Sequence, residues 1–174
     1  MVAMSDERQP ENGIAPEEAL RRVRIVLCRP SHPGNIGSAA RAMKNMGLAE
    51  LWLVEPKRFP EPEAEWLASG AVDVVRSARI CTRLADALGE CVAAYAISAR
   101  PREWSLEVLA ARDAAAQVLR DAASGPVALV FGTENAGLSN EELLACHRLV
   151  HIPANPAYSS LNLAQAVLVL SYEL

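Results

Sequence analysis

Apolar segments of strand length alternate with helical patterns along most of the chain. The longer segments are nearly continuous runs of Val, Leu, Ile and Ala, and such runs are typical of strands that are covered on both faces. Strands are expected at 23–28, 51–54, 79–81, 91–98, 127–131 and 148–152. Because strands that alternate with helices need crossover connections, the pattern predicts an α/β fold with a parallel sheet.

Residues with helical spacing fill the intervals between these strands. Helices are expected at 36–46, 61–69, 70–78, 84–90, 105–121, 140–146 and from about 160 to the end of the chain. The first helix has an apolar stripe that includes Ile36 and Met43, with polar residues opposite it, and Asn35 is a suitable N-cap. The last helix is apolar on nearly every side, which favours burial all round and therefore contact with a partner subunit.

Length and composition are those of an ordinary globular domain. The chain has 174 residues, 51% hydrophobic and 22% charged, and we expect a single domain over residues 21–174. Residues 1–20 are polar and acidic and are expected to form a flexible tail. The sequence shows neither the apolar stretch of a signal peptide nor the roughly 20 apolar residues of a membrane helix. The four cysteines are widely spaced and suggest no disulfide framework, which favours a reducing, cytoplasmic setting.

Positive charge is concentrated in one part of an otherwise acidic chain. The formal net charge is -4, yet residues 21–58 hold eight Lys or Arg against two acids. A local basic field attracts phosphate groups even when the whole chain is acidic. This stretch therefore indicates either a nucleic-acid-binding surface or an ordinary solvated charged surface.

Glycine, proline and polar residues cluster in three segments that follow predicted strands. The first, SHPGNIGS, opens a helix whose polar side carries Arg41 and Lys44. Backbone N–H groups at such a helix start bind anions. The segment lacks both G-x-x-x-x-G-K-[ST] and G-x-G-x-x-G, the two commonest nucleotide-binding fingerprints. A capped surface helix with two solvated cations is the alternative interpretation.

The second segment, FGTENAGLSNEE, follows the most strand-like run of the chain. Gly132 and Gly137 permit a tight turn and a close approach of the backbone to a ligand. Ser139 and Glu142 form the S-x-x-E pattern of a capping box, which leaves Glu134 without a structural explanation. Ligands bind at the carboxyl ends of strands in open α/β sheets, so Glu134 is a candidate binding residue, with a capping role as the alternative.

The third segment, IPANPAYSSLN, is stiffened by two prolines and enters the last helix through Ser159 or Ser160. These serines are either N-caps or ligand-binding residues. Two other arrangements carry little weight. Ser31–His32 and Cys146–His147 are only sequence neighbours, which does not make a nucleophile–base pair. The histidines have no metal-ligand spacing, so we expect no metal site and neither a hydrolase nor a metalloenzyme.

Three ordered segments of the chain resemble a known family. The motifs of the SpoU (TrmH-type) branch of the SPOUT RNA 2'-O-methyltransferases are similar, in order and spacing, to SHPGNIGSAARAMKNMGLAELWLVEP, VFGTENAGLSNEEL and HIPANPAYSSLNLAQAVLVLSYEL. Within that branch the chain is most similar to the N-terminal catalytic domain of the TrmJ type, which methylates ribose at position 32 of the tRNA anticodon loop. The resemblance spans nearly everything from Arg24 to Leu174.

The resemblance implies a fold, a cofactor and partners. The family fold is a parallel-sheet α/β domain with a deep trefoil knot near the C-terminus. Its members are homodimers that bind S-adenosylmethionine in the knot, close to the subunit interface. The implied substrate is RNA, with tRNA as the first choice and ribosomal RNA as the alternative. The alternative from a different functional class is a knotted RNA-binding module without transferase activity.

Matching positions carry the functional residues of the family onto this chain. The resemblance assigns catalysis to Arg41, Asn35 and Ser160, with Arg41 beside the ribose hydroxyl. It assigns the methyl donor to Ile97, Ser98, Ala99, Gly132, Glu134, Ile152, Ser159, Ser160, Leu161 and Asn162. The second motif departs from the family pattern, because Thr133 and Asn135 stand where relatives commonly have arginine.

Overall fold

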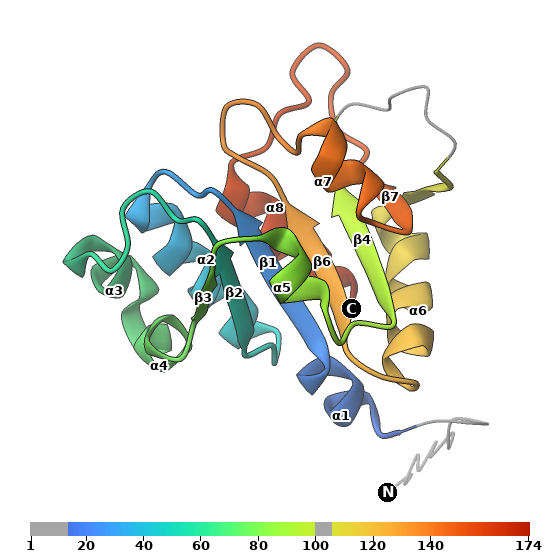
Figure 1. Ribbon diagram of the computed structural model, residues 1–174, viewed down its shortest axis with the longest axis horizontal. Helices are drawn as coiled ribbons and strands as arrows, with labels where there is room; N and C mark the ends of the chain where they lie inside the picture. Colours follow the sequence, from blue (N-terminus) through green and yellow to red (C-terminus); the bar gives the residue numbers. More distant parts are fainter. Residues whose placement is uncertain (1–13, 100–105) are drawn as a thin grey trace, which may run out of the picture.

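The described part of the chain, residues 14–99 and 106–174, is organised around one sheet in this computed structural model. The strands are β1 (Val23–Cys28), β2 (Glu50–Val54), β3 (Arg79–Cys81), β4 (Ala93–Ile97), β5 (Val108–Ala110), β6 (Val127–Phe131) and β7 (Arg148–His151). They form a seven-stranded sheet in the order β3-β2-β1-β6-β4-β7-β5, and every neighbouring pair is parallel (Figure 1). The predicted α/β fold with a parallel sheet is confirmed.

Helices cover both faces of the sheet. One face packs against α1 (Pro16–Arg21), α2 (Pro33–Asn45), α3 (Pro62–Ala68), the 3₁₀ turn η1 (Ser69–Ala71), α4 (Val72–Arg76), α6 (Ala111–Ala122) and α8 (Leu163–Glu173). The other face packs against α5 (Leu84–Leu88) and α7 (Asn140–Leu144). Side chains alternate along β1: Val23, Ile25 and Leu27 belong to the larger core, and Val26 and Cys28 to the smaller one. All six residues of β1 are buried, as a strand covered on both faces requires.

The start of α2 lies against α3 through a contact that only glycine permits. A Cβ atom built on Gly37 would lie 2.0 Å from the backbone oxygen of Ala64 and 2.9 Å from the backbone nitrogen of Ala68. Any side chain at position 37 would push the two helices apart, because both neighbouring atoms belong to the backbone. This glycine of the first motif therefore serves helix packing and sets the direction in which α2 leaves β1.

The strand order brings several loops to one edge of the sheet. β6 lies between β1 and β4, and β7 lies between β4 and β5. The carboxyl ends of parallel strands share an edge, so the loops that follow β1, β4, β6 and β7 gather there, at the top of Figure 1. This edge is the usual place for a ligand in an open parallel sheet. The trefoil knot implied by the resemblance stays a prediction.

The first predicted helix begins earlier than its apolar stripe suggested. α2 starts at Pro33, and His32 occupies the N-cap position. Proline suits the first helical position because its fixed φ matches the helix and its missing N–H would have had no partner there. The prediction that Asn35 caps this helix is wrong. Asn35 is the third residue of α2, and its side chain makes contacts with other loops.

The helix expected at 105–121 is shorter than predicted. α6 begins at Ala111, because Val108–Ala110 form the edge strand β5 and pair with Leu149–His151 of β7. Residues 100–105 lie outside the described part of the chain. Tertiary pairing has overridden a local preference here, as it often does in short apolar segments.

The segment expected to be a tail is partly helical. The helix α1, Pro16–Arg21, lies within and just beyond residues 1–20, and its Ala19 is only 4% exposed. Ala19 packs into the larger core, so the ordered domain begins before residue 21. Residues 1–13 lie outside the described part, and their flexibility stays a prediction.

Candidate active site

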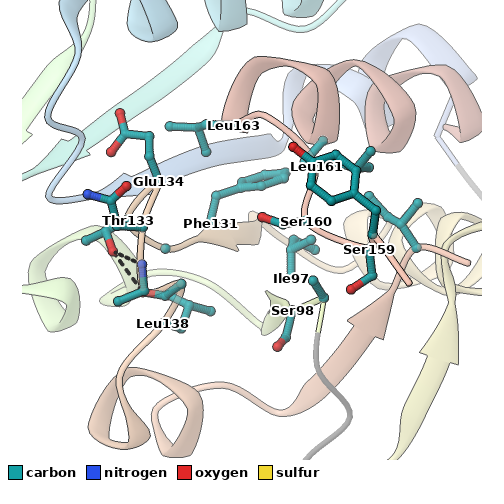
Figure 2. Close-up of a pocket in the computed structure, with 18 of the residues that line it drawn as sticks. Ile97, Ser98, Phe131, Thr133, Glu134, Leu138, Ser159, Ser160, Leu161 and Leu163 are labelled. Atoms are coloured by element: carbon teal, nitrogen blue, oxygen red, sulfur yellow. Dashed lines mark hydrogen bonds between the residues drawn. The ribbon is translucent and has the colours of Figure 1, made fainter. Parts of the chain in front are cut away.

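A pocket opens at the edge where the loops gather. Its volume is about 360 Å³. Figure 2 shows Glu134 on one side of it, Ser159 and Leu161 on the opposite side, and the ring of Phe131 between them. The lining consists of residues 97–99, 131–138, 152 and 157–161, together with Leu163 and Ala166. Segments that lie far apart in the sequence therefore build one concave site.

The pocket gathers nearly all of the residues that the resemblance assigned to the methyl donor. Those that line it are Ile97, Ser98, Ala99, Gly132, Glu134, Ile152, Ser159, Ser160 and Leu161. Asn162 does not line the pocket and lies directly before α8. Of the residues assigned to catalysis, Ser160 lines the pocket, whereas Asn35 and Arg41 lie outside its lining. The roles of all these residues in binding and catalysis stay predictions.

The loop after β6 closes on itself. The backbone N–H of Thr133 donates to the oxygen of Gly137 at 3.1 Å, and the N–H of Gly137 donates back to the oxygen of Thr133 at 3.0 Å. A Cβ atom at Gly132 would lie 2.0 Å from the carbonyl carbon of Gly137, whose own φ is 70°. The hydroxyl oxygen of Thr133 accepts from the backbone N–H of Ala136 at 3.1 Å. The turn therefore requires both glycines, and the threonine that departs from the family pattern helps to close it.

Glu134 joins this loop to the segment that precedes α2. Its carboxylate accepts hydrogen bonds from the Ser31 backbone N–H at 3.1 Å, from the Ser31 hydroxyl at 2.9 Å and from the His32 backbone N–H at 3.2 Å. The side-chain amide of Asn35 donates a further bond at 3.2 Å. Burial alone would raise the pKa of Glu134, but the donated hydrogen bonds outweigh it and hold the pKa below its usual range. Glu134 is therefore an anionic anchor at neutral pH.

Asn162 adds the third segment to this network. Its side-chain nitrogen donates to Oδ1 of Asn35 at 3.0 Å, while its own Oδ1 accepts from two backbone N–H groups in the first turn of α8. Gln165 completes a capping box by accepting from the backbone N–H of Asn162 at 3.3 Å. Of the two alternatives left open for Ser159 and Ser160, the capping role is therefore excluded. Both serines lie in the pocket lining instead.

Several residues of the site were not singled out from the sequence. Ser31 and His32, considered from the sequence only as a nucleophile–base pair and set aside, make most of the contacts to Glu134. Phe131, Leu138 and Tyr158 form walls of the pocket. Each lies within a segment that the sequence marked as a loop, and that location was the available signal.

Several basic residues of the stretch 21–58 are paired within the chain. Arg24 is only 6% exposed and donates to Glu90 at 2.8 Å. Lys44 reaches Asp73 at 2.8 Å on the surface. The stretch therefore presents fewer free charges to solvent than its composition suggested.

Arg41 lies on the exposed side of α2, six residues after Asn35, which is roughly 9 Å along the helix axis. Among the described residues, its guanidinium has no hydrogen-bond or ion-pair partner, and the same holds for the side chains of Lys57 and Arg58. The backbone N–H of Lys57 donates to the oxygen of Pro30 at 3.1 Å, which places this turn beside the segment that contacts Glu134. Uncommitted cations are thus available near the site.

Two kinds of site are not found in residues 14–99 and 106–174. No group of three or more His, Cys, Asp or Glu side chains there is arranged to hold a metal ion. Helices in the same ranges are all too short or too polar to cross a membrane.

Comparison with known families decides what kind of domain carries this pocket. The model of the SpoU rRNA Methylase family matches residues 22–172, which is most of the chain. The chain belongs to the SpoU rRNA Methylase family. The resemblance in the three motifs is therefore confirmed, and the pocket that these motifs build belongs to a SpoU domain.

Relatives of this SpoU domain include named enzymes and solved structures. The tRNA (cytidine/uridine/adenosine-2'-O-)-methyltransferase TrmJ of Pseudomonas aeruginosa (strain UCBPP-PA14) is 52% identical over 155 residues, which covers 88% of this chain and 60% of the relative. The crystal structure of TrmJ from Z. mobilis ZM4 matches with a TM-score of 0.83 at 40% identity, covering 86% of this chain and 66% of that one. The SpoU methyltransferase AviRb from Streptomyces viridochromogenes, solved in complex with the cofactor AdoMet, matches with a TM-score of 0.66 at 25% identity, covering 86% of this chain and 55% of that one. The chain spans less than two thirds of the length of the first TrmJ relatives it matches.

Proposed function

We propose that this chain is the catalytic domain of an S-adenosylmethionine-dependent tRNA 2'-O-methyltransferase that methylates ribose at position 32 of the anticodon loop. The observation that carries the proposal is the convergence of three segments on one pocket, joined by Glu134, Asn35 and Asn162. The names of the TrmJ relatives support the reaction and the class of RNA. Position 32 follows from the resemblance to the TrmJ type.

The pocket suits S-adenosylmethionine in size and in chemistry. A volume of about 360 Å³ lies in the range of sites for small cofactors. The apolar side chains of Ile97, Phe131 and Leu138 can pack against an aromatic base. Backbone groups of the surrounding loops can form hydrogen bonds with polar atoms of the cofactor. The related AviRb structure contains the same cofactor, which supports its assignment to this pocket.

When bound, S-adenosylmethionine supplies an electrophilic methyl carbon on a sulfonium, so the difficulty lies with the ribose hydroxyl. Arg41 does not act as the base, because a guanidinium stays protonated in proteins. In this account Arg41 binds the adjacent RNA phosphate and holds the 2'-hydroxyl in line for attack, and alignment of this kind supplies several kcal/mol of barrier lowering. Ser160 lines the pocket, and in this account it is the second catalytic group.

The partners follow from surface features of the same region. Arg41, Lys57 and Arg58 are exposed cations without partners among the described residues, and they would draw in the RNA backbone. Leu168 and Tyr172 on α8 are 40% and 71% exposed, which supports a homodimer that covers this helix. Action on tRNA would place the protein in the cytoplasm.

The experiment is incubation of the protein with methyl-labelled S-adenosylmethionine and either total tRNA or ribosomal RNA, followed by mass mapping. We expect label in tRNA as one added ribose methyl in the anticodon loop. Label in ribosomal RNA alone would favour the alternative substrate. Tight donor binding without label in any RNA would favour a binding module that lacks transferase activity.

A further inference from the structure

A second carboxylate of the motif that contains Glu134 is held by the first loop of the chain. Arg29, the residue after β1, donates from Nη1 to Oε1 and from Nη2 to Oε2 of Glu142, the latter at 3.1 Å. The side chain of Glu142 is 9% exposed and that of Arg29 is 34% exposed. A bidentate arginine–carboxylate pair is geometrically specific, and removing one partner of a buried pair leaves an uncompensated charge.

Glu142 also fixes the end of the loop after β6, residues 132–138, which is called the pocket loop below. The backbone N–H of Ser139 donates to Oε2 of Glu142 at 2.7 Å, and the backbone N–H of Glu142 donates to the hydroxyl oxygen of Ser139 at 3.2 Å. This is the capping box at the start of α7, and Ser139 directly follows the pocket loop. One carboxylate thus holds both the loop end and the guanidinium of Arg29.

The pocket loop is attached at both of its ends to the same short segment, residues 29–32. Glu134, near the start of the loop, binds the backbone and a side chain of this segment, and Glu142, just past its end, binds Arg29. The loop is closed by its own hydrogen bonds. We therefore expect a change at either attachment to alter the position of the whole loop.

The backbone of Arg29 is held in an uncommon conformation. Its φ is 49°, in the left-handed region that residues other than glycine rarely adopt. Its backbone N–H donates to the oxygen of Val54 at 2.7 Å, which extends the pairing of β1 with β2. Such a conformation persists only where the surroundings determine it, and here it directs the side chain across to α7.

We propose that Arg29 is a positioning residue for the methyl-donor pocket: it holds Glu142 and thereby fixes residues 132–138 in their donor-binding shape. This inference rests on the proposed function.

The Arg29–Glu142 pair lowers the pKa of Glu142. Burial alone would raise the pKa of Glu142, but hydrogen bonds from Arg29 and Ser139 outweigh it and hold the pKa below its usual range. The other titratable groups near the pair are the thiols of Cys28 and Cys146, both uncharged near neutral pH, and Glu55, which faces Arg29. Within residues 14–99 and 106–174, Arg29 is the cation that lowers the pKa of Glu142, so removing it would raise that pKa.

The test is the affinity for S-adenosylmethionine, measured by calorimetry at about pH 8 and about pH 6. Arg29→Met keeps the Cβ atom and the length of the side chain. We expect roughly tenfold weaker binding at the higher pH, where Glu142 is left as an unpaired buried anion, and a smaller deficit at the lower pH, where protonation removes that charge. Arg29→Met/Glu142→Gln should lose the extra pH dependence, because glutamine does not titrate and still accepts from the Ser139 backbone N–H. Arg29→Lys should recover part of the affinity, since it keeps the charge without the fork.

The matched control is Arg76→Met, which breaks the exposed two-bond pair with Glu65 at 2.9 and 3.0 Å and should leave donor affinity unchanged. A folded Arg29→Met protein that binds the donor like the wild type at both pH values would overturn the inference. If thermal unfolding shows that Arg29→Met does not fold, wild-type affinity in Arg29→Lys would overturn it. Failure of the wild type to bind the donor would instead count against the proposed function.

Discussion

Asn35 accepts a hydrogen bond from Asn162 at 3.0 Å, although the two residues are 127 positions apart in the sequence. The same Asn35 side chain donates to Glu134 at 3.2 Å. One side-chain amide at the start of α2 is therefore hydrogen-bonded both to the loop after β6 and to the residue that precedes α8. Because these two segments form opposite sides of the pocket, its shape depends on this amide.

Replacing Asn162 should separate the cap of α8 from the connection to Asn35. Asn162→Ala removes both, and we expect a loss of about 1 kcal/mol in the free energy of unfolding together with weaker donor binding. Asn162→Asp keeps a good cap but has no side-chain N–H to donate, so it should be nearly as stable as the wild type and still bind the donor weakly. Chemical denaturation and calorimetry measure the two quantities. Equal donor affinity for Asn162→Asp and the wild type would show that the connection does not matter for the pocket.

Glu134→Gln should change how stability depends on pH. The folded-state pKa of Glu134 is lowered, so its charged form stabilises the fold above the ordinary glutamic acid pKa of about 4.3, and this contribution is lost as the pH falls through the folded-state value. The wild type should therefore lose more stability than Glu134→Gln between neutral pH and about pH 3. Urea denaturation at a series of pH values makes the comparison. Parallel curves for the two proteins would contradict the anionic anchor.

Much of the fold could be predicted from the sequence, for reasons that particular elements make clear. β6 is a continuous apolar run, and β1 is apolar except for Arg24. The two strands pair in the centre of the sheet, and apolar runs of this kind are typical of strands that are buried on both faces. The capping box of Ser139 and Glu142 was also predicted, because it depends only on local spacing. These features are determined within a few residues of sequence.

Features that depend on distant partners could not be predicted in the same way. Asn35 was expected to cap α2, whereas the structure gives a capping role to Asn162 at α8. Both are good caps by residue type, and only the fold decides which of them caps a helix. Arg29 looked like one more member of a basic stretch, yet it is committed to Glu142, 113 residues away. The motifs located the site, whereas the contacts between them required the structure.

Gly132→Ala should disrupt the pocket loop, because the added Cβ atom would lie 2.0 Å from the carbonyl carbon of Gly137. Both atoms belong to a closed turn that cannot give way, so we expect a loss of about 2 kcal/mol or more in stability and no measurable donor binding. Gly70→Ala is the control, since no atom lies within 4 Å of its added Cβ, and it should stay within about 0.5 kcal/mol of the wild type. Wild-type donor binding by Gly132→Ala would contradict the described loop.

Arg41→Ala should abolish methyl transfer and leave the rest of the protein intact. The side chain is exposed and has no partner among the described residues, so stability should stay within about 0.5 kcal/mol of the wild type. Donor affinity should be unchanged, while the rate of transfer should fall about 100-fold or more because the hydroxyl is no longer aligned. Lys44→Ala, one turn further along α2 and paired with Asp73, is the matched control and should retain transfer. A parallel loss of donor affinity in Arg41→Ala would rule out the orienting role.

The most direct measurement compares two full-length tRNA molecules that differ only in the 2'-hydroxyl of nucleotide 32, which one of them lacks. Each is incubated with the protein and methyl-labelled S-adenosylmethionine, and the bound label is counted. We expect label on the tRNA with the hydroxyl and none on the tRNA without it. Equal labelling of the two molecules, or no labelling of either while the donor binds tightly, would contradict the account.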